Sequence, residues 1–171
     1  MYYDTTYDAA SQILKDALPI PDLPDFIQNV AIYTQYKGRL DNIDDSKAAL
    51  IYPIEQFISE YPSWTLVDSY FDIKGSDAAY ARMLKECEAK KIDLVITNSV
   101  NKLSCIYVTA SERIRKLHEH GTGICFMTEK LYSMEQNHAM ILMLLSTIAQ
   151  EESRRRSYVA SRSRQHVDGK Q

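Results

Sequence analysis

Short apolar segments alternate with helix-forming segments along most of this chain, and this alternation limits the folds that it can adopt. Apolar runs that predict strands fall at residues 30–33, 64–70, 92–97 and 123–126. Helical spacing is seen, for example, at Tyr80, Met83, Leu84 and Cys87. Strands and helices that alternate through short connections predict an α/β fold, with a mostly parallel sheet flanked by helices on both faces. Loops after the strands are then the expected place for function.

The first 29 residues do not follow this alternation. Ala10, Ile13, Leu14 and Leu18 have the spacing of a short helix, and three prolines in residues 19–25 predict a stiff linker after it. The linker would let the apolar side of this helix dock on the domain or on a partner. We therefore divide the chain into residues 1–29 (helix and proline-rich linker), 30–134 (α/β domain) and 135–171 (long helix and tail).

Composition narrows the class of protein. A chain of 171 residues with 45% apolar content suits one α/β domain with a sizeable core. We expect a cytoplasmic protein, because no run approaches the ~20 apolar residues of a membrane span and the N-terminus lacks a secretory signal pattern. The three cysteines are scattered and the four histidines lack zinc-ligand spacing, so we expect no metal and no cofactor.

One long helix is predicted from about residue 135 to about residue 165. Its first half is apolar nearly all round. One stripe, Ile141, Leu144 and Ile148, can pack on the parent sheet. The other stripe needs a second surface, for which another copy of the chain is the simplest candidate. The predicted dimer interface consists of Ile141, Leu142, Leu145 and Ala149.

The second half of this helix is basic, although the whole chain has a net charge of -3. Residues 151–171 contain six Arg or Lys against three Asp or Glu. The arginines have no aromatic residues interleaved, so they suit contacts with DNA phosphates rather than stacking on bases. A merely solvated charged helix is the alternative. The candidate DNA-binding residues are Arg154, Arg155, Arg156, Arg162 and Arg164.

Residues from about 30 to about 164 resemble the N-terminal catalytic domain of serine recombinases of the resolvase/invertase type. The resemblance follows the order of the predicted elements, and the end of the chain is most similar to the dimer-forming helix of the large serine recombinases. The segments that carry it are Val30–Tyr33, Pro62–Val67, Lys90–Val100, Ile114–Leu117 with Gly121, and Ser146–Arg154. The resemblance implies a resolvase-like fold for the α/β domain and a dimerisation role for the long helix.

The resemblance also implies a chemistry, and this chain departs from it. Family members attack a DNA phosphate with a serine, neutralise it with several arginines, and work as dimers that pair into tetramers. Their first strand ends in Tyr-x-Arg-x-Ser, whereas this chain has Gln35 for the arginine and Lys37 for the serine. The resemblance places the other active-site positions of the family at Asp77, Asn101, Lys102, Cys105 and Tyr158. Among these residues, Lys102 alone keeps the positive charge of the family pattern.

Three hypotheses follow. The first is a catalytically inactive family member in site-specific recombination of a mobile element, which acts by dimerisation, or by pairing with an active relative, and by DNA-backbone contact. The second is an active strand-exchange enzyme with an atypical nucleophile: Thr34, Ser99 or Ser104. The third is an interaction module that no longer binds DNA. No sequence-reading module is recognisable in residues 1–171, so DNA contact should be weak. Whether the chain is naturally short or truncated stays open.

Overall fold

The parallel sheet expected from the sequence is present in the computed structural model, which describes residues 5–38, 40–103 and 109–168. In these ranges five strands form one sheet in the order β2-β1-β3-β4-β5. The first four strands are parallel, and β5 pairs with β4 in the antiparallel direction. The strands are β1 (Asn29–Tyr36), β2 (Thr65–Ile73), β3 (Leu94–Thr97), β4 (Gly123–Phe126) and β5 (Leu131–Tyr132).

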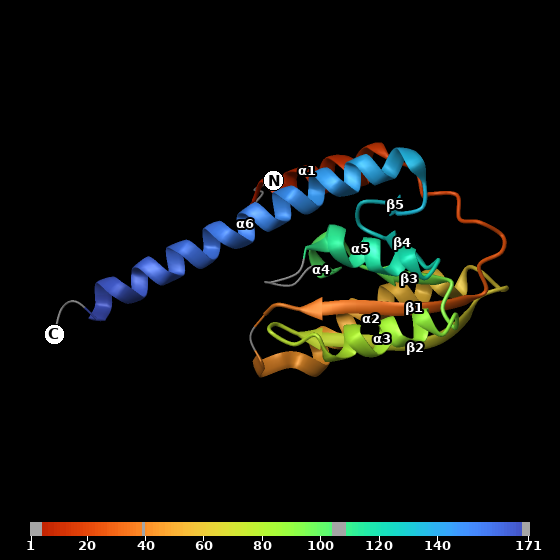
Figure 1. The fold of residues 1–171 in the computed structure, drawn as a ribbon, viewed down its shortest axis with the longest axis horizontal. Helices are drawn as coiled ribbons and strands as arrows, with labels where there is room; N and C mark the ends of the chain where they lie inside the picture. The colour runs from red at the N-terminus through yellow and green to blue at the C-terminus, as the bar shows by residue number, and fades with distance from the viewer. Residues whose placement is uncertain (1–4, 39, 104–108, 169–171) are drawn as a thin grey trace.

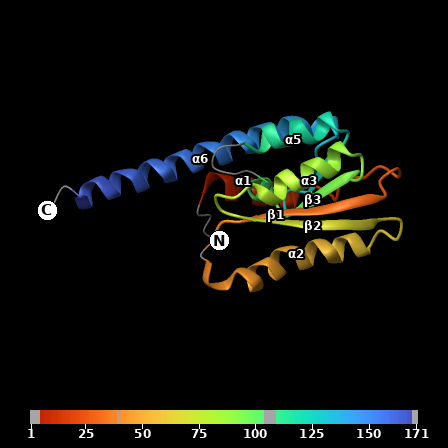
Figure 2. The same ribbon diagram turned by 60° about the horizontal axis from the view of Figure 1, so that its bottom comes forward.

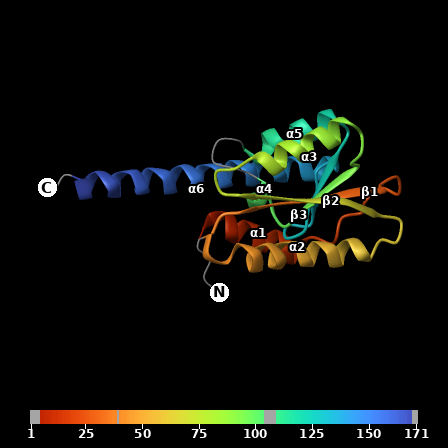
Figure 3. The same cartoon turned by 90° about the horizontal axis from the view of Figure 1, so that it is seen from below.

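Helices cover both faces of this sheet, which confirms the predicted fold class. Helix α2 lies on one face, and α3 and α5 lie on the other (Figures 2 and 3). Pro53 lies inside α2 without ending it. The helices next to the sheet are α2 (Ile43–Ser59), α3 (Ala78–Glu88), α4 (Val100–Leu103) and α5 (Ala110–Glu119). Helix α2 follows the short 3-10 turn η1 (Leu40–Asn42).

Alternating side chains of β1 feed two separate cores. Val30 and Ile32 face α2, while Ala31 and Tyr33 face the side of α3 and α5. This alternation follows from the two-residue period of a strand. The strand runs three residues further than predicted, because Thr34 and Gln35 are also buried and the ladder to β2 continues to Tyr36. The two-residue strand β5 was not predicted.

Two helices complete the larger core. Helix α1 (Thr6–Ala17) begins at Thr5, whose side chain accepts a hydrogen bond from the backbone N–H of Asp8. It lies beside the first half of α6 (Gln136–Asp168), and the second half of α6 projects beyond the body (Figure 1). Within the described ranges, no helix combines the length and apolarity needed to cross a membrane.

The apolar stripes of α6 only partly follow the sequence-based expectation, since Ile141 and Ile148 pack against the core as predicted. Leu142, Leu145 and Ala149, predicted to await a partner, are buried in the larger core of this chain. Leu144, predicted to pack on the sheet, is 62% exposed. Ile141 is half-buried against the core. The prediction for Leu142, Leu145 and Ala149 failed because α1, α4 and α5 all contact α6 and cover this stripe within the same chain.

Candidate functional site

Lys37 and Asn101 meet at the carboxyl edge of the sheet, where β1 and β3 end. Nζ of Lys37 donates to the backbone carbonyl of Asn101 at 2.6 Å and to its side-chain Oδ1 at 2.9 Å. Asn101 lies in α4, which starts three residues after β3. Parallel sheets gather function at this edge. The structure therefore brings together two residues that the resemblance placed at active-site positions.

Gln35 lies two residues before Lys37 and is 1% exposed. Within the described ranges, its Nε2 has no hydrogen-bond partner. By strand alternation its side chain is on the same face of β1 as Tyr33. The position to which the resemblance assigns an arginine therefore holds a buried neutral amide, and an amide does not neutralise a phosphate charge.

The two acidic residues after β2 have different roles. Asp72 is buried, and its carboxylate accepts hydrogen bonds from the backbone N–H groups of Ala79 and Tyr80, each at 2.9 Å. It thereby caps the start of α3, where anionic groups are favoured. Asp77, the residue that the resemblance placed in the arginine's position, instead forms an ion pair with Arg113 from α5.

Arg113 is the cation that the sequence analysis missed at this edge. Its side chain is 1% exposed, and its guanidinium lies 4.0 Å from the ring centroid of Tyr80. It also donates to the hydroxyl of Tyr33 at 2.7 Å. Burial raises the pKa of Tyr33, which stays protonated. The available signal was the helical spacing of Arg113 with Leu117, which places it on the buried side of α5.

Lys102 retains the positive charge of the family pattern. It lies in α4, is half-buried, and burial lowers the pKa of its ammonium group. Cys105 and Ser104 lie outside the described residues. Lys102 follows Asn101 directly in the chain, next to the Lys37–Asn101 pair.

Thr34 is poorly placed to act as an alternative nucleophile. It is fully buried, and its Oγ1 donates to Oδ1 of Asn98 at 2.7 Å. Nδ2 of Asn98 in turn donates to the backbone carbonyl of Leu50 in α2 at 2.7 Å. The side chain of Thr34 points to the opposite face of β1 from that of Gln35. Ser99 is half-buried next to α4.

A buried carboxylate, Glu129, is a second feature that the sequence analysis missed. It lies between β4 and β5, is fully buried, and accepts hydrogen bonds from the hydroxyls of Tyr7 at 2.5 Å and Ser11 at 2.9 Å. Both hydroxyls come from α1. The sequence shows only an acidic residue in a short connection, so the signal for burial was absent.

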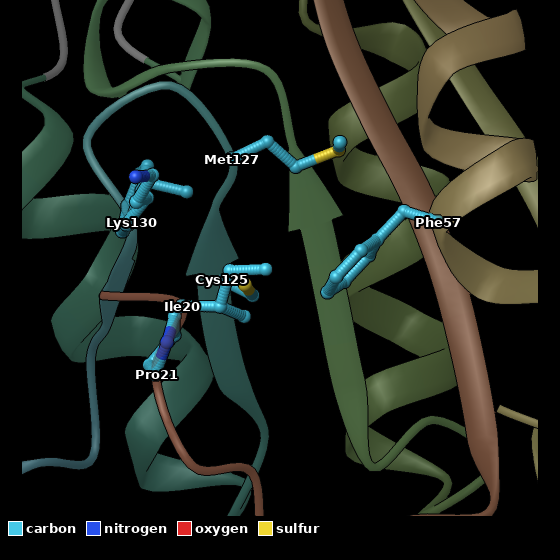
Figure 4. Close-up of a pocket in the computed structure, with 7 residues that line it drawn as sticks. Ile20, Pro21, Phe57, Cys125, Met127 and Lys130 are labelled. Carbon is cyan, nitrogen blue, oxygen red and sulfur yellow. The ribbon is translucent and has the colours of Figure 1, made fainter. Parts of the chain in front are cut away.

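An apolar cavity of about 160 Å³ lies between β4 and Phe57 of α2 (Figure 4). Among the residues that line it, Cys125 carries the one side chain that could lose a proton to become an anion. Burial raises the pKa of this thiol to about 12, so it is protonated at neutral pH. The cavity lacks converging polar groups and does not resemble a catalytic site. It is lined by Ile20, Pro21, Phe57, Cys125, Phe126, Met127 and Lys130.

Comparisons with known proteins settle the family. A family model described as the N-terminal domain of resolvase matches residues 43–170, well over half of the sequence. The chain belongs to the resolvase family. This confirms the resemblance to serine recombinases, and it implies a role in site-specific DNA recombination. The matched range starts after β1, so the assignment of Gln35 and Lys37 rests on the position of that strand.

Two solved structures share the fold of this resolvase-family domain. The N-terminal catalytic domain of TP901-1 integrase has a TM-score of 0.54 and 20% identity, covering 73% of this chain and 96% of that one. A resolvase family site-specific recombinase from Streptococcus pneumoniae has a TM-score of 0.59 and 14% identity, covering 81% and 99%. No curated protein matches the sequence significantly.

The candidate DNA-contacting arginines lie on the projecting half of α6. This half and the carboxyl end of β1 extend toward the same end of the domain (Figure 1). Arg154, Arg155 and Arg156 are exposed. Arg162 is exposed as well and lies over the ring of Tyr158, 5.8 Å from its centroid. The side chain of Arg164 falls beyond the described part.

Tyr158 is therefore on the projecting half of α6 rather than among the residues of the sheet edge. Of the residues that the resemblance singled out, the structure brings Lys37 and Asn101 into contact and places Asp77 with Arg113. In the described part of the chain, no group of His, Cys, Asp and Glu side chains is arranged to hold a metal ion.

Proposed function

We propose that this resolvase-family domain serves site-specific recombination of a mobile element without cutting DNA itself, by dimerising and contacting the DNA backbone. The observation that carries the proposal is the lysine at the end of β1. Its ammonium group is held by Asn101 at 2.6 and 2.9 Å. A lysine binds a phosphate but does not form the phosphoserine link on which the family's chemistry depends.

The surrounding charges support the same conclusion. Gln35 is neutral, and the guanidinium of Arg113 is buried, covered by Tyr80 and paired with Asp77. A guanidinium that is buried and already paired with a carboxylate binds a phosphate poorly. Loss of one charge-stabilising group typically costs 10²–10³-fold in rate, so loss of several removes cleavage. Thr34 as a replacement nucleophile is disfavoured by its complete burial.

The test is a search for a covalent protein–DNA adduct. The purified chain and Lys37→Ser are incubated with duplex DNA, beside an active resolvase-family recombinase on its own target as the positive control. We expect no adduct from either, because Lys37→Ser restores a hydroxyl but none of the arginines. A phosphoserine or phosphothreonine link found by mass spectrometry in the unsubstituted chain would overturn the proposal and identify the nucleophile. An adduct from Lys37→Ser alone would instead contradict the argument that the remaining charges are too few for cleavage.

Backbone contact is assigned to the exposed arginines of α6. If Arg154, Arg155 and Arg156 each neutralise a phosphate, log K for duplex DNA falls with log salt by about 0.9 per contact. Replacing the three by Gln should flatten that slope by about 2.7. Arg115→Gln is the matched control, because Arg115 is exposed on α5 and paired with Glu119. An absence of binding at low salt would favour an interaction module that does not use DNA.

Dimerisation is assigned to the outward stripe of α6. Met140, Met143 and Leu144 are 75%, 61% and 62% exposed and recur at helical spacing. Since the family assembles through this helix, a second copy of the chain is the proposed occupant. Leu144→Glu should weaken self-association in sedimentation velocity, whereas Ile13→Glu, at an exposed apolar site on α1, should not. A strict monomer at high concentration refutes homodimerisation. Association on mixing with an active relative would then support a heteromer.

A further inference from the structure

Helix α1 is anchored to the body by polar groups as well as by apolar packing. The hydroxyls of Tyr7 and Ser11 both bond to the carboxylate of Glu129, which is fully buried. Leu14 and Leu18 pack at the margin of the larger core. Hydrogen bonds from two hydroxyls to a buried carboxylate fix the position of α1 more narrowly than apolar contacts do, because they are directional.

The same groups hold the start of α4. Glu129 accepts a hydrogen bond from the backbone N–H of Val100 at 3.3 Å, and the hydroxyl of Tyr7 accepts one from the backbone N–H of Asn101 at 2.9 Å. The first N–H groups of a helix have no partner within it. Here a side chain of α1 and one from the β4–β5 connection supply those partners. The position of Asn101, and through it that of Lys37, therefore depends on α1.

Helix α1 is also bonded to α6. The backbone N–H of Tyr7 donates to the carboxylate of Glu152 at 3.0 Å, just before the arginines of the projecting half. Tyr7 also belongs to the same buried cluster as Leu142, Leu145 and Ala149. One residue of α1 thus contacts the segment at the sheet edge and the long helix at the same time.

We propose that α1 is a latch that couples the sheet-edge segment Val100–Leu103 to α6, so that release of α1 loosens both together. When α1 leaves, the Glu129 carboxylate and the N–H of Asn101 lose partners in a buried setting. A buried polar group without a partner is costly, so the start of α4 must open to water. The same event uncovers the buried stripe of α6. This coupling does not depend on whether the domain binds DNA.

The test is hydrogen exchange followed by mass spectrometry on the full chain. Tyr7→Phe removes the hydroxyl and keeps the ring. Loss of this buried hydroxyl should raise exchange about tenfold at Val100–Leu103. Exchange at residues 142–149 of α6 should rise by the same factor, because one opening exposes both segments. Strand β3 should be unchanged. Gln12→Ala is the control, since Gln12 bonds to Asp16 on α1 itself.

Faster exchange confined to α1, or no change in any segment, would overturn the proposal, because α1 would then be a passive cover. Different factors at the two segments would also overturn it. Should Tyr7→Phe fail to fold, Ser11→Ala removes a single hydroxyl from Glu129 and keeps the bond from Asn101. It should raise exchange in both segments by a smaller, equal factor. A change in one segment alone would again count against coupling.

Discussion

Leu144 and Leu145 are adjacent on α6, but the first is exposed and the second is buried, so truncating each in turn tests the corrected orientation of this helix. Leu145 is 2% exposed in the larger core, and Leu144 is 62% exposed. Replacement of a buried leucine by alanine removes apolar burial and leaves a cavity, at a cost of about 2–5 kcal/mol. The same change at an exposed position should stay within about 0.5 kcal/mol.

The length of this chain sets the change in melting temperature that such a loss of stability produces. Taking a middle value of about 3 kcal/mol, Leu145→Ala should lower Tm by about 6–12 °C in a domain of this size. Leu144→Ala should leave it nearly unchanged. Urea denaturation at pH 7 measures the free energy of unfolding directly, as a change in midpoint at constant slope. Repeating it over a range of protein concentrations separates folding from association, since a dimer makes the midpoint depend on concentration.

Two results would refute the orientation of α6. Equal losses at the two positions would mean that both faces are covered to the same degree. A Leu145→Ala variant of unchanged stability at low concentration, with weakened self-association, would mean that Leu145 faces a partner, as the sequence alone predicted. The structure instead predicts that loss of association belongs to Leu144 and loss of stability to Leu145.

Further predictions concern the buried charges. Asp77→Ala should destabilise the domain by about 2–3 kcal/mol in urea denaturation, because it leaves the buried guanidinium of Arg113 without its carboxylate, with a discount for the 48% exposure of Asp77. Arg113→Met should lower the free energy of unfolding by less than Asp77→Ala does, since Asp77 is then hydrated by water. A larger loss for Arg113→Met than for Asp77→Ala would contradict this prediction. Burial raises the pKa of Glu129, so its stabilising contribution is complete below the unfolded value of about 4.3 and is lost as pH rises through the folded value. The stability of the wild type minus that of Glu129→Gln should therefore fall with rising pH, and a flat difference would contradict the raised pKa.

The sequence was sufficient for the fold because each layer has its own periodic signal. The apolar runs of β3 and β4 are short and uninterrupted, as buried parallel strands require. The spacing of Tyr80, Met83 and Cys87 predicted a buried side of α3, and all three are buried. Strand β5 could not be predicted in this way, because two residues are too few to show a period.

The orientation of α6 could not be derived from the sequence, because its first half is apolar nearly all round. Either stripe satisfies helical spacing, and the choice depends on where α1 docks. That docking rests on Tyr7 and Ser11 meeting Glu129, which lies more than 110 positions away from both in the chain. Polar contacts of this kind depend on tertiary geometry, which periodicity does not encode.

The same reasoning explains why the edge of the sheet was only half predictable. The resemblance to the family pattern singled out Lys37, Asn101 and Asp77, but it gave no partner for Asp77. In the structure Asp77 and the buried Arg113 compensate each other. A charge pair that is internally satisfied attracts a phosphate poorly, because the guanidinium has already exchanged water for a carboxylate, a hydroxyl and an aromatic face. In this structure the Asp77–Arg113 pair stabilises the fold, and a substitution at Lys37 alone would leave that pair in place.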